Sequence, residues 1–359
     1  MAFMTASPSR FRHESRPQLV LSGSGMAAEH LLEAVEHTGA QRIMLIGSPR
    51  SVAEVEKLAC ALPVVYRHAD VAMHVPRETA DAARAAAVAS SADALLAVGG
   101  GSATGVAKAV AHRSGLPIIA VPTTYAGSEA TAAWGETEAG RKRVSVDPAV
   151  LPAVVIYDAT LMLSLSRSLS IASGLNALAH CIDSMWAPST DPVARALAIE
   201  GIRALRDGLA AIARDTDDLV GREHALVGAW LAGQAFASAG SGLHHKLCHL
   251  LGGTFDLPHA ETHAAVLPHV LALNAPAAPE AESRIAVALG ADRAVAGLAE
   301  LYDLLDAPRS LRDLGLRATD LDDAARAATA IVPPDNPARI DLDGMRPLLD
   351  AAWRGALPR

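Results

Sequence analysis

Histidines gather in one short part of this sequence, at spacings that could bring several imidazoles into one site. Six of the 14 histidines fall between positions 244 and 269: His244, His245, His249, His259, His263 and His269. His245 and His249 are four residues apart, as are His259 and His263, so each pair shares one helix face. Neutral imidazole binds borderline metals and also relays protons. The cluster predicts a metal site or a set of proton donors, whereas we interpret His244 and His269 as structural.

A second expected helix carries Asn176 and His180, again four residues apart. A lone histidine is more often a satisfied buried or surface side chain. This pair can nevertheless converge with the histidine cluster on a cation, or supply proton donors to the same cleft.

A triple glycine supplies a different kind of chemistry. The segment VGGGSATGVAKAVA is an apolar strand, then Gly99, Gly100 and Gly101, then Ser102 and a helix. Glycines let backbone approach a phosphate closely, and a helix N-terminus offers free N–H groups. We expect Ser102 to cap the helix and to donate to a phosphate oxygen. The alternative is a tight strand-to-helix turn without a ligand, since the pattern only resembles G-x-G-x-x-G.

The next apolar strand ends in a segment rich in hydroxyl groups, PTTYAGSE. It brings four candidate cofactor-binding residues to the same end of the sheet, namely Thr123, Thr124, Tyr125 and Ser128. Hydrogen bonding within the turn is the simpler alternative for the two threonines.

These motifs need elements that hold them in place. Near-continuous apolar strands are expected at residues 19–21, 42–46, 64–66, 94–98, 118–121 and 154–156, with helices at 26–38, 51–61, 79–90 and 103–112. Such strands indicate a parallel sheet covered on both faces, a doubly wound α/β domain whose ligands lie beyond the carboxyl ends of the strands. The charged stretch 131–151 suggests a hairpin at the sheet edge.

Strand patterns stop near Asp158, and helices are expected at 168–187, 192–212, 218–239 and 258–274, with two or three more before the C-terminus. We therefore predict a dinucleotide-binding domain over residues 1–157 and an all-helical substrate domain over residues 158–359. With no linker between them, the domains should abut around a cleft.

Composition excludes several functional classes. The chain of 359 residues has a net charge of −8 and no basic run, which argues against nucleic acid as a partner. Neither a signal peptide nor an apolar run of membrane-spanning length is visible. The three cysteines, Cys60, Cys181 and Cys248, form no C-x-x-C pair, which fits a cytoplasmic protein.

Four motifs, in order, carry a family resemblance: GGGSATGVAKA, PTTYAGSEAT, SGLNALAHCID and HHKLCHLLGGTFDLPHAETHAAVLPHVLALN. From about Gln18 to the C-terminus the chain resembles the iron-containing alcohol dehydrogenase superfamily, and within it the maleylacetate reductase branch. The resemblance implies a fold shared with dehydroquinate synthases and a homodimer. It also implies NADH or NADPH held by residues 99–102 and by Thr123 and Thr124. Gly47-Ser48-Pro49 carries no carboxylate to select NAD, so NADPH is tolerated.

The resemblance also implies a metal site and a proton relay. Metal-binding members use one Asp and three His, which correspond here to Asn176, His180, His245 and His259, and His249 matches the relay histidine near the nicotinamide. Asn176 removes the anionic ligand, so affinity for a divalent metal (Fe or Zn) should fall steeply.

The implied activity is NAD(P)H-dependent reduction of a small oxo-acid, maleylacetate to 3-oxoadipate in aromatic catabolism. In this hypothesis His245 and His259 stabilise an enolate as hydrogen-bond donors and His249 supplies a proton. Val146 stands where the branch commonly has Arg, so a cation for the dianionic substrate is missing unless the basic run 141–143 replaces it. The alternatives are a metal-dependent alcohol or ketone oxidoreductase and a family member repurposed for a biosynthetic or non-redox role.

Overall fold

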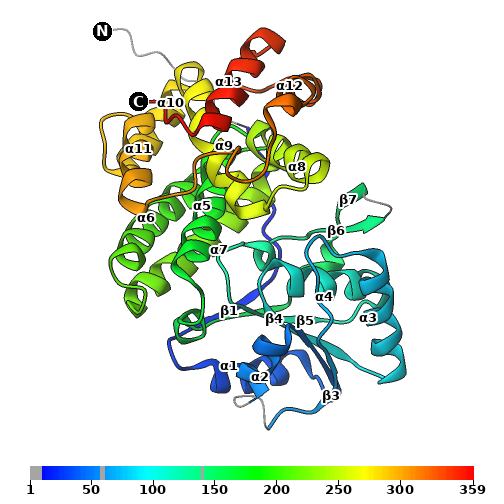
Figure 1. Ribbon diagram of the computed structural model, residues 1–359. Coiled ribbons are helices and arrows are strands. Elements are labelled where there is room, and N and C mark those ends of the chain that lie inside the picture. The colour runs from blue at the N-terminus through cyan, green and yellow to red at the C-terminus, as the bar shows by residue number, and fades with distance from the viewer. Residues whose placement is uncertain (1–9, 57–60, 139–140) are drawn as a thin grey trace.

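The computed structural model describes residues 10–56, 61–138 and 141–359, with the side chains of 141 and 142 left aside. It has a lower part built on a parallel sheet and an upper part built of helices (Figure 1). The expected α/β plus all-helical architecture is confirmed. Along the first part the elements are β1 Leu19–Ser22, α1 Ala27–Thr38, β2 Ile43–Gly47, α2 Pro49–Glu56, β3 Val64–His68, α3 Arg77–Ala89, β4 Ala94–Gly99, α4 Gly101–Ser114, β5 Ile118–Pro122 and β8 Val154–Tyr157.

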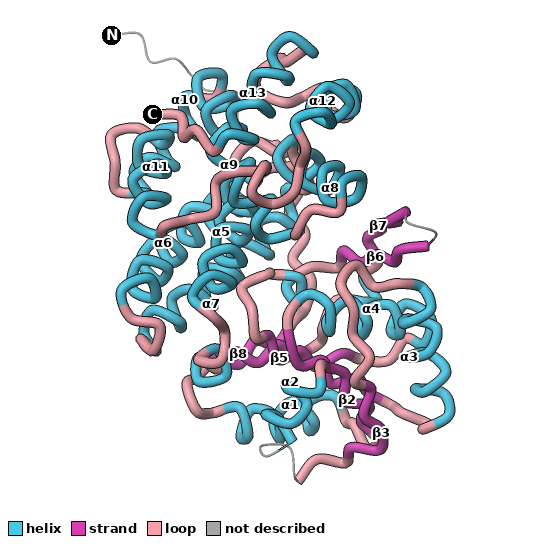
Figure 2. Tube along the Cα trace, in the orientation of Figure 1, coloured by secondary structure: helices cyan, strands magenta, loops and turns pink. Residues whose placement is uncertain are grey.

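All six predicted strands form, and they pair in parallel in the order β1-β8-β5-β4-β2-β3. Alternate residues of the strands point to opposite faces, where α1 and α2 cover one side and α3 and α4 cover the other (Figure 2). In the middle of the sheet Gly99 lies beside Pro122, so β4 and β5 end together. This shared edge brings the glycine turn and the hydroxyl-rich turn side by side.

The charged hairpin forms but is not an extension of the sheet edge. Strands β6 Ala133–Glu138 and β7 Arg141–Val146 make a separate two-stranded antiparallel sheet, and the edges of the large sheet are β1 and β3. Side-chain ties hold it against the helices on one face, since Arg84 of α3 binds Glu136 of β6. The expectation of an edge position was wrong, because the hairpin is held to α3 by this ion pair and to the segment before α3 by Thr137, whose N–H donates to the carbonyl oxygen of Val75 at 3.0 Å.

The second part is helical throughout the described chain. Its helices are α5 Arg167–Ser184, α6 Pro192–Arg214, α7 Leu219–Ala239, α8 Leu243–Phe255, α9 His259–Asn274, α10 Pro279–Leu289, α11 Ala294–Leu305, α12 Leu321–Ala330 and α13 Leu342–Arg354. Four helices follow α9, more than the two or three expected, because short turns divide the last 80 residues more finely than the apolar pattern indicates. Helix α5 lies at the centre and is buried at every position from Ser170 to Ser184.

One side chain ties the two parts together. Gln18, at the start of β1, donates through Nε2 to the carbonyl oxygens of Glu129 and Pro152, at 2.9 Å each. Its Oε1 accepts hydrogen bonds from Trp230 and Gln234 of α7, at 3.4 and 3.3 Å. Gln18 therefore joins the sheet to the helical part at one edge of the boundary between them.

Two of the three cysteines are described, and both Cys181 and Cys248 are buried free thiols. Cys60 lies outside the described residues, as does the end of the helix expected at 51–61, of which α2 covers 49–56. Within the described ranges, no helix has the length and apolar character needed to cross a membrane.

Candidate active site

A cavity of about 770 Å³ separates the ends of the strands from the helical part. The turns after β4 and β5 form one wall, and helices α5, α8 and α9 form the other. Nine of the predicted site residues line it, namely Gly101, Ser102, Thr124, Ser128, Asn176, His180, His245, His249 and His259. The sequence motifs from the two halves of the chain thus face one common space.

The glycine turn presents backbone to this cavity. Gly99 has φ of 141°, a conformation that favours glycine, and α4 begins at Gly101 with Gly100 as N-cap. A Cβ at Gly100 would lie 2.8 Å from a side-chain carbon of Thr124, so only glycine fits. Ser102 lies inside the first turn and the N-cap makes no side-chain hydrogen bond, so the prediction that Ser102 caps the helix was wrong. The first N–H groups of α4 remain available to an anion.

The second turn is divided between the cavity and the interior. Thr124 and Ser128 line the cavity, whereas Tyr125 is fully buried and lies 3.3 Å from Nη1 of Arg222 on α7. The side chain of Tyr125 therefore packs against the helical part instead of meeting a cofactor, contrary to expectation. Thr123 is outside the cavity lining, and its N–H donates to the carbonyl of Gly99 at 3.0 Å, which holds the two turns together.

Lys108 of α4 supports this wall and was missed by the sequence analysis. Its Nζ donates to the carbonyl oxygens of Ser128, Thr131 and Ala133 at 2.6 to 2.8 Å. Burial lowers the pKa of Lys108 to about 7, and the nearby Glu129 opposes that shift. The one available signal was a lysine within the apolar run VAKAV, where a buried charge needs several acceptors.

On the other wall, a buried carboxylate orients the central histidine. Oδ2 of Asp183, on α5, accepts hydrogen bonds from the N–H of Gly242 at 2.9 Å and from Nδ1 of His245 at 2.8 Å. A Cβ at Gly242 would lie 2.4 Å from Oδ1 of Asp183, so glycine is needed for this approach. Burial raises the pKa of Asp183, which the N–H groups at the start of α8 oppose. Asp183 thus holds both the beginning of α8 and the ring of His245.

This contact determines what His245 can offer. Because Oδ2 of Asp183 already accepts a backbone N–H, it acts as an acceptor, and His245 donates its Nδ1–H. Burial, followed by the nearby His249 and His259, holds the pKa of His245 well below its usual range. A neutral His245 that donates through Nδ1 presents the Nε2 lone pair to the cavity. It is therefore a ligand or an acceptor, and the role of hydrogen-bond donor expected for it does not fit.

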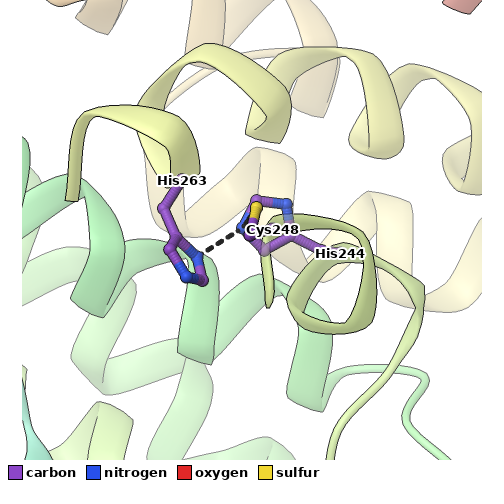
Figure 3. A group of neighbouring side chains, drawn as sticks. All are labelled: His244, Cys248 and His263. Carbon is purple, nitrogen blue, oxygen red and sulfur yellow. Dashed lines mark hydrogen bonds between the residues drawn. The ribbon is translucent and has the colours of Figure 1, made fainter. Parts of the chain in front are cut away.

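A fifth imidazole packs behind this wall without lining the cavity. His263 of α9 is fully buried, its ring centre lies 4.6 Å from that of His259 and 4.9 Å from that of His245, and its Nδ1 is 2.9 Å from Nε2 of His244. Figure 3 shows this hydrogen bond between α9 and α8, with Cys248 over the His244 ring; its sulfur is 3.6 Å from Nε2. The spacing of His263 placed it in the predicted histidine cluster, but no individual role was predicted for it.

The inner imidazoles are neutral. Burial is the main cause that holds the pKa of His180, His245 and His263 well below the usual value, and neighbouring histidines add to it. His249 is exposed and His259 is half-buried, whereas His180, His245 and His263 are buried. Neutral imidazole is the form that binds metals.

Six buried atoms of this wall lack any hydrogen-bond partner among the described residues: Oδ1 of Asn176, Nδ1 of His180, Oδ1 of Asp183, Nδ1 of His244, Nε2 of His245 and Nε2 of His263. Unpaired buried acceptors are costly unless a ligand satisfies them, so they fit a divalent cation. In this cavity the ligand atoms that lie within 4.8 Å of one another are those of His249, His259 and His263. The ligand atoms of the predicted set, His180, His245 and His259, do not all lie within 4.8 Å of one another, and no carboxylate oxygen completes the set.

Family models match both halves of the chain. Residues 17–159 match the model described as iron-containing alcohol dehydrogenase, and residues 170–353 match the C-terminal model of the Fe-containing alcohol dehydrogenase family. Curated relatives include a maleylacetate reductase from Burkholderia cepacia, 43% identical over 97% of this chain and 99% of the relative. Another, from Sphingobium indicum, is 44% identical over the same shares of the two chains.

Solved structures agree with these matches. An iron-containing alcohol dehydrogenase from Corynebacterium glutamicum superposes with a TM-score of 0.95 at 49% identity and covers 98% of each chain. A maleylacetate reductase from Agrobacterium tumefaciens superposes with a TM-score of 0.93 at 41% identity, over 98% of this chain and all of the other (100%). The similarity therefore spans both walls of the cavity.

Proposed function

This chain belongs to the iron-containing alcohol dehydrogenase family, and we propose that it is an NAD(P)H-dependent reductase that converts maleylacetate to 3-oxoadipate. The observation that carries the proposal is one cavity with two complementary walls. Free N–H groups of α4 suit the phosphates of a dinucleotide, and neutral imidazoles face them. Relatives at 43 and 44% identity that bear the name maleylacetate reductase support the substrate.

The reaction adds a hydride to the alkene carbon β to the ketone and a proton to the α carbon, which yields the saturated oxo-acid and the oxidised cofactor. When bound, the reduced nicotinamide supplies the hydride and a divalent Fe or Zn ion supplies Lewis acidity toward the ketone. The histidine wall must then stabilise negative charge on the ketone oxygen and deliver the proton.

We assign these tasks to three histidines. His259, half-buried at the first position of α9, donates a hydrogen bond to the developing oxyanion. His245 presents its Nε2 lone pair and orients either a metal ion or the substrate. His249 is exposed one turn along α8 from His245, with its ring centre 5.8 Å from that of His259, so it exchanges protons with solvent and passes them inward.

Cofactor binding falls to the opposite wall. The backbone of residues 99–101 and the side chains of Ser102, Thr124 and Ser128 are our candidates for NADH or NADPH. The strand β2 ends in Gly47, and Ser48 and Pro49 follow without a carboxylate that would reject a 2′-phosphate. We also propose a cytoplasmic homodimer, as the sequence resemblance implies.

The decisive experiment follows NAD(P)H oxidation with maleylacetate as the substrate, before and after treatment with EDTA. We expect turnover with maleylacetate and identification of 3-oxoadipate as the product. Absence of turnover with both cofactors would contradict the proposed function.

The unpaired atoms of Asn176, His180, His245 and His263 favour a second candidate, a metal-dependent alcohol or ketone oxidoreductase. Metal analysis of the purified protein and the same assay with alcohols and ketones separate the two, because this candidate predicts stoichiometric metal and loss of alcohol or ketone turnover in EDTA. The conjugate reduction proposed above has no such requirement in principle, since hydrogen-bond donors can stabilise the enolate.

A further inference from the structure

A dianionic oxo-acid needs a positive charge in the cavity, and the cavity offers few. Lys108 and Arg16 are the only lysine and arginine among its described lining residues. The ammonium of Lys108 is fully buried and already donates to three carbonyl oxygens. The inner histidines His180 and His245 are buried, and their unpaired ring nitrogens are already assigned to a metal ion or to the reacting group. Of the basic run 141–143, Arg143 does not line the cavity, and the side chains of 141 and 142 lie outside the described part of the structure. Among the described side chains, Arg16 is therefore the charge that remains for a substrate carboxylate.

Arg16 is positioned by anchors on both sides of it. Upstream, Nδ1 of His13 lies 2.8 Å from the carboxylate of Asp191 in the helical part. Downstream, Gln18 is bonded to both parts of the molecule. Figure 1 shows this blue segment before β1 running down from the helical part to the sheet. The segment thus crosses the cavity mouth with its two ends fixed.

The same segment brings Arg16 near the base of the hairpin. Gln18 contacts the carbonyl of Glu129, and Arg16 precedes it by two residues, a backbone span of at most about 7 Å. From Glu129 the chain leads directly into β6, where Ala133 pairs with Val146 of β7. Val146 lines the cavity and is 68% exposed, so it offers this region an apolar surface.

The guanidinium of Arg16 is available for a ligand. Arg16 is exposed and makes no hydrogen bond or ion pair with the described part of the chain. Glu14, its acidic neighbour in the lining, pairs instead with Arg12 at 3.3 Å. An exposed cation that lines a cavity beside an apolar surface is suited to bind a carboxylate through two parallel hydrogen bonds.

We propose that Arg16 determines specificity by binding one carboxylate of the dianionic oxo-acid at the cavity mouth, a charge that Val146 cannot supply. This inference rests on the proposed function. It gives the N-terminal segment a direct part in substrate selection and leaves the cofactor wall and the histidines their separate roles.

The test compares Arg16→Gln with Arg10→Gln, a matched control on the same segment that is exposed and does not line the cavity, and that leaves the Arg12–Glu14 pair intact. We expect Arg16→Gln to raise KM for maleylacetate about tenfold to a hundredfold, the loss of a charge-assisted hydrogen-bond pair, with kcat and the cofactor KM within about twofold of wild type. Arg10→Gln should match the wild type. In the Arg16→Gln background, Val146→Arg should recover at least half of the lost affinity on a logarithmic scale.

Each other outcome has a defined meaning. A wild-type enzyme without maleylacetate turnover overturns the proposed function and this inference with it. Wild-type turnover with an unchanged substrate KM in Arg16→Gln, or a raised cofactor KM instead, overturns the inference alone. Failure of Val146→Arg to rescue would refute the claim that positions 16 and 146 serve the same carboxylate.

Discussion

The two walls of the cavity offer different chemical groups to a ligand. The sheet wall works through backbone, since Gly99, Gly100 and Gly101 remove side chains and expose N–H groups at the start of α4. The helical wall works through side chains that three helices bury and orient, as Asp183 does for His245. The sheet wall depends on the space that the missing side chains leave. The helical wall depends on the protonation states and hydrogen-bond partners of its side chains. Changes to the two should therefore fail in different ways.

The largest expected effect is a loss of stability at low pH, because it comes from the histidines of the helical wall alone. His180, His245 and His263 have pKa values held well below 6.5 in the folded protein, so below pH 6.5 the unfolded chain binds protons that the folded chain excludes. Stability is thus complete above pH 6.5 and is lost as pH falls toward the lowered values, by up to about 1.4 kcal/mol per pH unit for each histidine. Urea unfolding of metal-free protein at pH 7.5 and 5.5 measures this loss.

A second protein tests whether the buried histidines cause this pH dependence of stability. The double variant His244→Gln and His263→Gln removes two buried imidazoles, so its stability should depend less on pH than that of the wild type. Equal pH dependence in both proteins would show that the histidine wall is not the source.

His259→Ala should have the next largest effect. Removing a donor to the developing oxyanion should lower kcat/KM for the oxo-acid by about a hundredfold to a thousandfold. The cofactor dissociation constant, measured by nicotinamide fluorescence, should stay within about twofold because the other wall is untouched. A parallel loss of cofactor affinity would mean that the walls are not independent.

Asp183→Asn tests how the helical wall orients its ligands. The amide keeps the shape of the carboxylate but weakens the acceptor for Nδ1 of His245, so affinity for Zn²⁺ should fall about tenfold to a hundredfold. Isothermal titration with Zn²⁺ measures it, and Asp303→Asn, an exposed aspartate far along the chain, serves as the control. Unchanged affinity would leave Asp183 only as the partner that holds the start of α8.

Gly100→Ala should have the smallest effect of the four and should affect only the cofactor. Its Cβ would meet Thr124 at 2.8 Å, and overpacking of this kind costs about 1 to 3 kcal/mol, so the cofactor KM should rise about tenfold. Adding Thr124→Ala removes the two closest atoms, and because Thr124 is itself a candidate cofactor contact, the double variant is compared with Thr124→Ala alone. We expect Gly100→Ala to cost less in that background than in the wild type. An equal cost in both backgrounds would show that the contact with Thr124 is not the cause.

Sequence patterns predicted the sheet wall well because its logic is local. All six strands, the glycine turn and the hairpin are readable from runs of a few residues. Two of the errors there came from a distant partner and a small shift. Tyr125 reads as a turn residue, but it is buried against Arg222, 97 residues along. Ser102 reads as a cap for a helix that begins at residue 103, but the helix begins two residues earlier, at Gly101.

The helical wall was predicted in its histidines but not in what supports them. Asp183 near the end of α5 resembles an ordinary polar residue, and its role depends on His245, 62 residues later. His263 was recognised by spacing alone, and only the packing of α8 against α9 shows that it faces the other imidazoles. Periodicity identifies which residues share a helix face, but not which faces meet.

Gln18 has a mechanical consequence for this cavity. It joins the two parts beside the edge strand β1, and the hydrogen bond from Arg222 of α7 to Tyr125 joins them again just after β5. A relative rotation of the two parts that keeps both hydrogen bonds must turn about the line through them. Arg16, two residues from Gln18, lies close to that line and is displaced little. The cation at the mouth of the cavity therefore keeps its place when the two parts move.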